Sequence, residues 1–432
     1  MRKGRQPVAR RPCWQKLGSV IPNDSFRVSD VVTTLHKSWM RAGTRERGAL
    51  SAHLLLVGGE DHDLRIPFML AMRDSGFRVT SMGTGDPAPF RRAGLEYHAF
   101  SFDRFVNPAA DLGAMRALRR LFADLRPQIV HSFDTKPNLL VPLAARSFRD
   151  LLVVRTINGL GWLFSSRRLL PMALRPVYCG LHRHAARTTR MTVFQNRVDQ
   201  GFFESHRMLG RGGSRVIPGS GVDLTQFQQR LTDGPRAADL RAELGLGDAE
   251  TVITVTRMTR QKGIHTLLKA AALVNRVRPT TRFVLVGPWE TEGAEAIGPD
   301  EIARHAPYVI ATGKRKDVPA LLHMADVFAF PTEYREGVPR VLLEAALARL
   351  PIVTTDMPGC SDVVRDGSSG LLVPPRDPAR LAEGIIALLN DRARARMMAE
   401  RAARIVIDEF GLTRNVALYA AAYRELLDRG AQ

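Results

Sequence analysis

Cysteine is scarce in this sequence: the chain of 432 residues has three, Cys13, Cys179 and Cys360. Because they are odd in number and far apart, they fit neither a disulfide framework nor a zinc-binding ladder, and we expect a reducing, cytoplasmic environment. Long apolar runs are also missing. The nearest candidates, residues 151–154 and 160–164, are far shorter than the stretch of about 18 residues that a membrane span needs. The N-terminal region lacks the apolar centre of a secretory signal, so we expect neither export nor a membrane crossing.

Aromatic residues are few, at 7% of the chain, whereas the net charge of +20 is large and indicates an anionic partner. Basic stripes that bind nucleic acid are interleaved with aromatic side chains; here they are not, so we expect no nucleic acid partner. An anionic membrane surface or phosphorylated substrates fit the charge better. Residues 1–48 carry eleven basic residues against three acids and little apolar patterning. We predict that this stretch is a basic, disordered extension.

Short apolar segments alternate with helical patterns twice along the chain, on either side of the glycine-containing segment 216–223. Continuously apolar strands between amphipathic helices predict a parallel sheet covered on both faces. We therefore expect an α/β protein with two Rossmann-like domains, residues 49–218 and 219–410, whose strand ends face a central cleft. A C-terminal helix in residues 411–432 could return across that cleft. The predicted strands are residues 53–57, 77–81, 128–130, 251–256, 282–286, 308–311, 326–330 and 352–354, and the predicted helices are residues 64–75, 112–125, 264–277 and 412–428.

Two glutamates, Glu336 and Glu344, flank the segment GVPRVLL at the start of a predicted helix. Pro339 suits the first helical position, which leaves the amides near Arg340 and Val341 free to bind a phosphate. At 1.5 Å per residue the two carboxylates should be about 10–15 Å apart, too far for a hydrolytic pair. The spacing fits two anchors at opposite ends of a nucleotide-sugar. A solvated helix start with one acid near the dipole explains the pair equally well.

The stretch that contains this pair, residues 331–375, reads PTEYREGVPRVLLEAALARLPIVTTDMPGCSDVVRDGSSGLLVPP. It resembles the nucleotide-sugar half of the family-four retaining glycosyltransferases, which have the GT-B fold, and the resemblance runs from about Ala52 to Phe410. It implies that Glu336 contacts the transferred sugar near the reacting centre and that Glu344 holds the ribose hydroxyls. The donor site would also include Gly337, Val338 and Arg340.

Arg257 and Lys262 form a second constellation, in VTRMTRQKGIHTLLKAA. Two cations at the end of a strand and the start of a helix would neutralise a diphosphate and stabilise its departure without proton transfer. A single basic residue in a loop is commonly only solvated. The spacing between the two matches the diphosphate-binding pair of the family.

Several residues of the N-terminal half are candidates for the same site. Gly58 and Gly59 follow the first strand, where glycine lets the backbone approach the donor, although tight strand–helix turns also use glycine. His131 is predicted to stand where a strand ends at the cleft and to donate to a sugar hydroxyl or the developing charge. A satisfied loop histidine is the competing interpretation, and relatives often show His-x-His where this chain has His-Ser-Phe. Lys136 and Asn138 follow in a segment that resembles the acceptor-side loop, where the lysine could hold a pyrophosphate.

Asp61 and Asp63 form a DxD sequence, the motif that holds a divalent metal in the other large glycosyltransferase fold. Here they follow the glycine loop of the first strand and lack an evident third ligand. We interpret them as surface acids. We expect no metal site and no cofactor, with a nucleotide-sugar, most simply a UDP-sugar, as co-substrate.

Residues 165–191 contain six arginines, no acid and many apolar side chains. This composition suits an interfacial segment on anionic lipid, whereas a core-facing helix with a solvated basic side is the alternative. Pro171 and Pro176 argue against one long helix. The preceding RTINGLGWLFS, residues 155–165, resembles enzymes that extend undecaprenyl-diphosphate-linked sugars, which favours the membrane.

The resemblance implies a retaining glycosyltransferase. It would move a hexose or N-acetylhexosamine from a nucleotide-sugar to a lipid-diphosphate-linked saccharide, peripherally on the cytoplasmic face of the inner membrane, in cell-surface polysaccharide or glycan assembly. Attack from the same face would need no enzymic nucleophile. A nucleotide-sugar 2-epimerase of the same fold and a non-enzymatic binder of anionic polymers are the alternatives.

Overall fold

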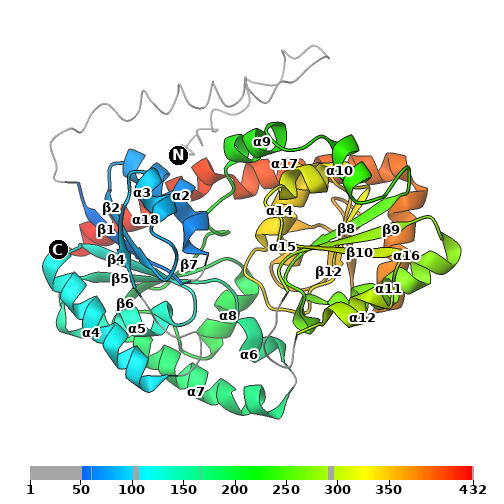
Figure 1. Ribbon diagram of the computed structural model, residues 1–432. Coiled ribbons are helices and arrows are strands. Elements are labelled where there is room, and N and C mark those ends of the chain that lie inside the picture. Colours follow the sequence, from blue (N-terminus) through cyan, green and yellow to red (C-terminus); the bar gives the residue numbers. More distant parts are fainter. Residues whose placement is uncertain (1–50, 60, 101–106, 167, 290–295, 431–432) are drawn as a thin grey trace, which may run out of the picture. The chain divides into compact units, whose positions relative to one another are not determined.

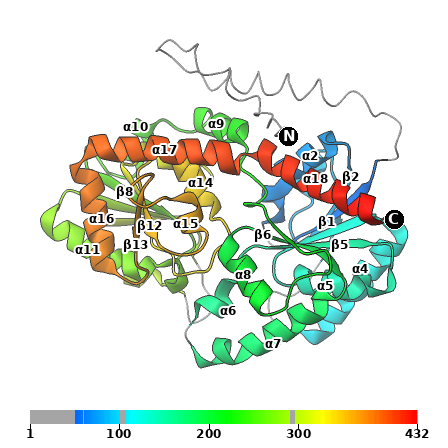
Figure 2. The same ribbon diagram turned by 180° about the vertical axis from the view of Figure 1, so that it is seen from behind.

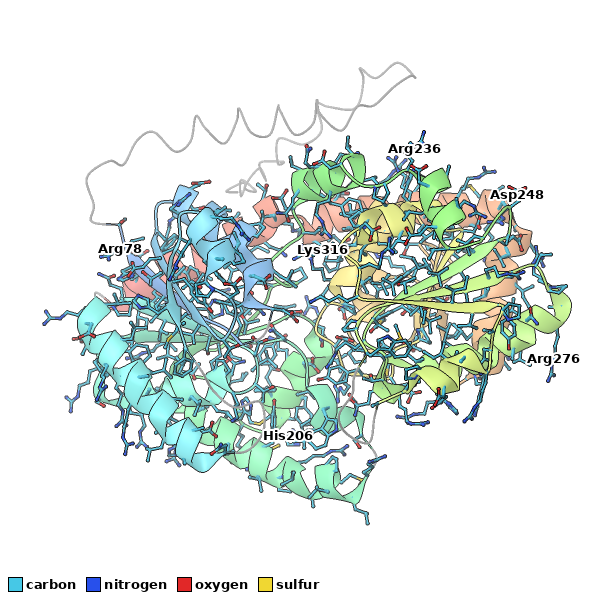
Figure 3. The ribbon with its side chains drawn as sticks, viewed as in Figure 1. Arg78, His206, Arg236, Asp248, Arg276 and Lys316 are labelled. Atoms are coloured by element: carbon cyan, nitrogen blue, oxygen red, sulfur yellow. The ribbon has the colours of Figure 1, made fainter. Side chains whose placement is uncertain are left out.

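The computed structural model of the chain describes residues 51–430 except 60, 101–106, 167 and 290–295 (Figure 1). The predicted extension, residues 1–48, lies outside them. Two parallel sheets organise the described part. Charged side chains lie on the outer surface around the two sheets, where Arg78, Arg236 and Arg276 are exposed (Figure 3).

The N-terminal sheet has seven strands in the order β3-β2-β1-β4-β5-β6-β7, and each neighbouring pair is parallel. This order, with β1 beside both β2 and β4, is that of an open α/β sheet with helical crossovers. The strands are β1 (His53–Val57), β2 (Arg78–Gly83), β3 (Glu96–Ala99), β4 (Ile129–Phe133), β5 (Leu152–Ile157), β6 (Thr189–Phe194) and β7 (Ser214–Val216). The helices between them are η2 (His62–Arg65), α2 (Ile66–Asp74), α3 (Ala88–Arg92), α4 (Pro108–Leu125), α5 (Pro137–Ala144), η3 (Ala145–Ser147), α6 (Gly161–Ser165), α7 (Leu169–Ala186) and α8 (Arg197–Ser205).

The C-terminal sheet has six parallel strands in the order β10-β9-β8-β11-β12-β13. They are β8 (Thr251–Val255), β9 (Arg282–Val286), β10 (Val309–Gly313), β11 (Val327–Phe330), β12 (Ile352–Thr355) and β13 (Leu371–Val373). The helices of this half are α9 (Leu224–Thr232), α10 (Ala237–Glu243), η4 (Arg260–Lys262), α11 (Ile264–Val277), α12 (Pro299–Ala303), α13 (Val318–Met324), α14 (Arg340–Leu347), α15 (Cys360–Val363), α16 (Pro378–Asn390) and α17 (Arg392–Phe410), and α18 (Leu412–Gly430) follows them in the chain.

Each sheet is covered on both faces because its strands are apolar at successive positions. In β1, Leu54 and Leu56 belong to one buried cluster, and Leu55 and Val57 to the cluster on the other face. Since successive side chains of a strand point to opposite faces, a run without polar residues supplies two cores at once. The predicted two-sheet α/β fold is confirmed.

The last helix, α18, packs on the N-terminal half, although it follows α17 of the C-terminal half (Figure 2). Its side chains Val416, Tyr419 and Tyr423 are buried in the same cluster as Leu54 and Phe68. The Phe68 and Tyr419 rings meet edge to face with centroids 5.1 Å apart. The chain therefore returns to the first sheet at its end.

Some predicted boundaries differ from the structure. Residues 264–277 and 282–286 form α11 and β9 with the predicted bounds, whereas β4 continues to Phe133 instead of ending at residue 130. The apolar pattern of the sequence does not predict the strands β3, β5, β6, β7 and β13. In β5 the reason is Arg155, a wholly buried guanidinium that donates to the Met208 carbonyl over 2.8 Å and interrupts the apolar run.

Helix α7 is continuous over 18 residues, so the prediction that its prolines prevent one long helix is wrong. Pro171 lies in the first turn, where its missing N–H would have no helical partner in any case. Pro176 removes one interior hydrogen bond and is exposed. Among the described helices, including α7, none combines the length and the apolar composition that a bilayer crossing demands.

Candidate active site

Charged side chains of the C-terminal half gather where β8 and β11 end. Lys262 closes the turn η4, and Gly263 follows with a φ of +74°. A Cβ at Gly263 would stand 1.8 Å from the Pro331 carbonyl oxygen, so this position requires glycine. The close approach fixes Lys262 against the chain that leaves β11, which is the segment that carries Glu336.

Lys262 and Glu336 form an ion pair in which the ammonium donates to Glu336 Oε1. The two side chains are only 11% and 17% exposed, and the ammonium also lies 4.8 Å from the centre of the Tyr334 ring. A largely enclosed cation is thus held beside a carboxylate, 74 residues away in the chain. The structure brings together these two predicted site residues.

Arg257, the second predicted cation, is half-buried in the turn that follows β8. Hydrogen bonds on both sides of the arginine anchor the turn to the end of β9 and to the residues that follow β9. The Thr256 N–H donates to the Val286 carbonyl over 2.8 Å, and the Met258 N–H to the Pro288 carbonyl over 3.1 Å. Its backbone position is therefore set by the sheet, two residues beyond the end of a central strand.

Glu344 lies in the second turn of α14 and is buried. Its Oε1 faces two guanidinium groups, Arg340 at 3.3 Å and Arg230 at 3.8 Å. Pro339 is the N-cap of α14 and not its first residue, one position from the prediction. Arg340 also reaches the N-terminal half, where it donates to the Leu64 carbonyl over 3.2 Å.

The loop of residues 334–338 is bound to the N-terminal half by contacts that the sequence does not reveal. The Arg335 N–H donates to Ser165 Oγ over 2.8 Å, and the Gly161 N–H donates to the Arg335 carbonyl over 3.2 Å. A Cβ at Gly159, where φ is +105°, would lie 2.5 Å from that carbonyl oxygen. The glycines of the RTINGLGWLFS stretch are the sequence signal of this close approach.

Asp199 is a further group near the site, and no motif in the sequence points to it. It is wholly buried in the first turn of α8, and its carboxylate accepts from Asn196 Nδ2 over 2.9 Å and from Arg335 over 3.1 Å. Burial raises the pKa of Asp199, while the Asn196 hydrogen bond and the Arg335 charge partly offset that rise. Through this pair α8 holds the residue that precedes Glu336.

His131 is not at the end of a strand, so that prediction is wrong. It lies in the middle of β4, wholly buried, with Nδ1 2.5 Å from Tyr423 Oη and Nε2 2.7 Å from Thr156 Oγ1. Burial lowers the pKa of His131 well below its ordinary value, and the nearby charge of Arg65 adds to the effect. The ring is neutral and links β4, β5 and α18, and it has no part in the site that we propose below.

Asn138 is likewise buried, and its contacts contradict a role in binding an acceptor. Its Nδ2 donates to the Thr156 carbonyl over 2.7 Å, and its Oδ1 accepts from Ser132 Oγ over 2.8 Å. Lys136, at the N-cap of α5, is 18% exposed and pairs with Asp111 at 2.7 Å. Of the two predicted acceptor residues, only Lys136 remains a candidate.

The glycine loop after β1 is shaped by packing. A Cβ at Gly58 would lie 2.0 Å from Nδ1 of His62, a buried histidine whose pKa burial lowers to about 3. The Gly59 N–H donates to Asp134 Oδ2 over 2.9 Å. Asp61 and Asp63 are exposed on either side of His62, as predicted for surface acids. Within the described residues, no three His, Cys, Asp or Glu side chains group as metal ligands.

Two models of protein families match the chain, one on each half. The model described as Glycosyltransferase Family 4 matches residues 68–209, and the model described as Glycosyl transferases group 1 matches residues 237–405. The first match lies in the N-terminal half and begins after the glycine loop, and the second lies in the half with Lys262 and Glu336. Together they take in most of the residues that form the two sheets.

Two curated relatives show the range of this family. The α-D-kanosaminyltransferase of Streptomyces kanamyceticus is 28% identical over 58% of this chain, and the aligned part is 64% of the relative's length, slightly less than two thirds. The N,N'-diacetylbacillosaminyl-diphospho-undecaprenol α-1,3-N-acetylgalactosaminyltransferase of Campylobacter jejuni is 24% identical over 86% of this chain and 96% of its own.

Among solved structures, HepE of Anabaena in complex with UDP and glucose superposes with a TM-score of 0.70. The alignment covers 87% of this chain and 100% of HepE at 18% sequence identity. At that identity the likeness shows the shared fold of two facing α/β halves, and nothing about the ligand of this chain.

Proposed function

The chain belongs to the family-four glycosyltransferases of the GT-B fold, and on that premise we propose that it transfers a hexose or N-acetylhexosamine from a UDP-sugar to a lipid-linked saccharide. The product would serve the assembly of a cell-surface polysaccharide or glycan. The observation that carries the proposal is the enclosed Lys262–Glu336 pair at the ends of β8 and β11. It offers a cation for a diphosphate and a carboxylate for a sugar at adjacent positions.

The chemistry that we propose is retention by attack on the face that the diphosphate leaves. The bond from the anomeric carbon to the diphosphate oxygen breaks, the bond to the acceptor oxygen forms, and the acceptor proton passes to the leaving diphosphate. Lys262 and Arg257 stabilise the negative charge that develops. Glu336 orients the sugar hydroxyls and the ammonium of Lys262, and Glu344 accepts from the ribose hydroxyls. No enzymic nucleophile and no metal takes part.

The acceptor that we propose is a saccharide on a lipid diphosphate. The Campylobacter relative is named for such a substrate, and the RTINGLGWLFS stretch resembles enzymes of that kind. Lys136, partly exposed at the start of α5, offers a cation to the acceptor diphosphate. A UDP-sugar is the donor that we propose, by analogy with HepE, a protein of the same fold whose structure contains UDP and glucose.

A transfer assay tests the proposal. We expect saccharide transfer from one UDP-sugar of a panel to an undecaprenyl-diphosphate-linked acceptor, with equal rates in the presence of EDTA. Glu336→Gln should lower turnover by about 100-fold, the loss that follows removal of one preorganised electrostatic group. The matched control is Glu383→Gln, an exposed glutamate on α16. Release of free nucleotide and an epimerised sugar without acceptor, or abolition of activity by EDTA, would contradict the proposal.

We propose that the protein acts at the cytoplasmic face of the inner membrane and that α7 binds this surface. Five apolar side chains of this helix face solvent: Leu169 (86% exposed), Leu170 (66%), Val177 (56%), Met172 (46%) and Leu181 (46%). So many exposed large apolar residues on one helix, with arginines beside them, are typical of an interfacial helix. Arg175 has a structural task, since it donates to the Leu163 and Ser166 carbonyls. Arg167 lies outside the described residues.

Vesicle binding tests the role of α7. We expect co-sedimentation with anionic vesicles and release at 1 M salt, where the Debye length is about 3 Å. Leu169→Glu with Leu170→Glu should weaken binding by about tenfold or more, because two leucines that each gain about 1.5–3 kcal/mol on burial are replaced by charges that the surface repels. Val277→Glu with Met397→Glu is the control, since both are exposed apolar residues on other helices. Equal loss in both double variants would contradict the assignment.

A further inference from the structure

We propose that Asp134, Asn158 and Gln195 form a hydrogen-bonded relay that positions the donor-binding loop, residues 336–338, relative to the glycine loop at Gly59. The relay is a positioning device for the transfer reaction and rests on the function proposed above. None of its three side chains belongs to the predicted site. They connect two segments that do belong to it.

The order of strands in the N-terminal sheet places the three side chains in a row. Asp134, Asn158 and Gln195 each follow the last residue of a strand, namely β4, β5 and β6. These strands are neighbours in the sheet and parallel, so their carboxyl ends lie at one edge. Gly59 stands two residues beyond β1, which pairs with β4. Four adjacent strands thus contribute one group each.

Three hydrogen bonds run along this row toward Asp134, and a fourth reaches Asp134 from the other end. The Val338 N–H donates to Gln195 Oε1 over 2.7 Å, and Gln195 Nε2 donates to Asn158 Oδ1 over 2.9 Å. Asn158 Nδ2 then donates to Asp134 Oδ1 over 2.8 Å, while the Gly59 N–H donates to Asp134 Oδ2 over 2.9 Å. Because a carboxylate only accepts and a backbone amide only donates, the two ends fix the orientation of both side-chain amides.

Close contacts at both ends of the row couple its side chains to the segments beside them. A Cβ at Gly337 would lie 2.2 Å from Gln195 Oε1, so the loop approaches the relay more closely than any other residue would allow. At the other end, the guanidinium of Arg65 lies 3.6 Å from Asp134 and stacks over the Phe133 ring at 4.5 Å. The relay thus ends on a carboxylate that has a guanidinium group beside it.

The variant Gln195→Glu distinguishes a hydrogen-bonded relay from a side chain that only packs against its neighbours. Ionised, the glutamate can accept from the Val338 N–H but cannot donate to Asn158. If the Asn158 amide turns to donate to it, the Asn158 oxygen then faces the Asp134 carboxylate. Protonated, the glutamate restores one donor and one acceptor and reproduces the original row. Gln195→Glu should therefore work better as the pH falls, and Gln195→Ala should not.

The experiment compares Gln195→Glu, Gln195→Ala and a control, Gln200→Glu, which changes another half-buried glutamine of the same half. At pH 8 we expect kcat to fall by about 10- to 100-fold in both variants at position 195, since small misplacements of reacting groups cost up to that much. Between pH 8 and pH 6 the glutamate variant should recover at least fivefold relative to the alanine variant, while the control follows the unsubstituted protein. Equal pH profiles for the two variants, or full activity of Gln195→Glu at pH 8, would overturn the relay.

A measurement without substrate keeps the relay separate from the proposed function. Hydrogen–deuterium exchange of a peptide that spans residues 336–342 reports the Val338 amide. We expect its exchange to be at least tenfold faster in Gln195→Ala than in the unsubstituted protein, with Gln200→Ala unchanged. If the unsubstituted protein shows no transfer but the exchange rises as stated, the function is wrong and the relay stands. If transfer is observed and the exchange is unaltered, the relay is wrong.

Discussion

We expect Lys262→Met to lower kcat for glycosyl transfer by about 100- to 1000-fold, the cost of removing one preorganised electrostatic stabiliser from a water-poor site. The Lys262 side chain is only 11% exposed and its ammonium is held between Glu336 and the Tyr334 ring, so the charge is weakly screened and needs no reorganisation. The leaving diphosphate carries more negative charge in the transition state than in the bound donor, and for that reason the loss should fall on kcat more than on KM.

The control for this experiment is Lys269→Met, an exposed lysine seven residues further along in α11. It removes the same charge from the same half of the protein and should leave kcat within twofold. Lys262→Arg should recover part of the loss, since the charge is kept and the geometry altered. Because Lys262→Met also leaves the Glu336 carboxylate without its partner, thermal unfolding of each variant is needed to exclude global damage. A decrease of kcat below tenfold in a folded Lys262→Met protein would contradict the role assigned to the lysine.

Where the information is local, the sequence predicts the structure well. The β8 and β9 strands and helix α11 have continuous apolar runs or one apolar face, and their predicted and observed bounds agree within a residue. Lys262 and Glu336 are each correctly predicted to follow a strand, and they lie seven and six residues beyond β8 and β11, which are neighbours in the same parallel sheet. Neighbouring parallel strands bring their carboxyl ends together whatever the loop lengths between them.

The residues that the sequence places wrongly, or does not reveal, are those whose surroundings come from distant parts of the chain. His131 is enclosed by Tyr423 of α18, 292 residues away, and no pattern around the histidine announces that helix. Gln195 and Asn158 look like ordinary loop residues until the strand order makes them neighbours. Likewise, Asp199 reads as a helix-start acid, and only the contact between the two halves shows that it holds Arg335.

The second large effect that we expect is a loss of folding stability at acidic pH, and three buried histidines cause it. His62, His131 and His182 are at most 1% exposed, and burial is the first cause that lowers the pKa of each. The value for His62 falls to about 3, and His131 and His182 lie well below the ordinary value. Below pH 6.5 the unfolded chain therefore binds protons that the folded chain does not, and folding stability decreases as the pH falls. Asp199 opposes this trend, since its raised pKa favours the folded state in acid.

We expect the free energy of unfolding in urea to be nearly constant from pH 8 to 7 and to fall between pH 6.5 and pH 5, by up to about 1.4 kcal/mol per pH unit for each histidine that stays neutral in the folded state. A loss of a few kcal/mol is a large fraction of the stability of a typical domain. His182→Gln should make the decrease smaller, whatever its effect at pH 8, because one proton fewer is bound on unfolding. His323→Gln changes an exposed histidine of α13 and should leave the decrease as it is. Equal stability at pH 8 and pH 5, or the same pH dependence in His182→Gln as in the unsubstituted protein, would show that these histidines are charged in the folded state.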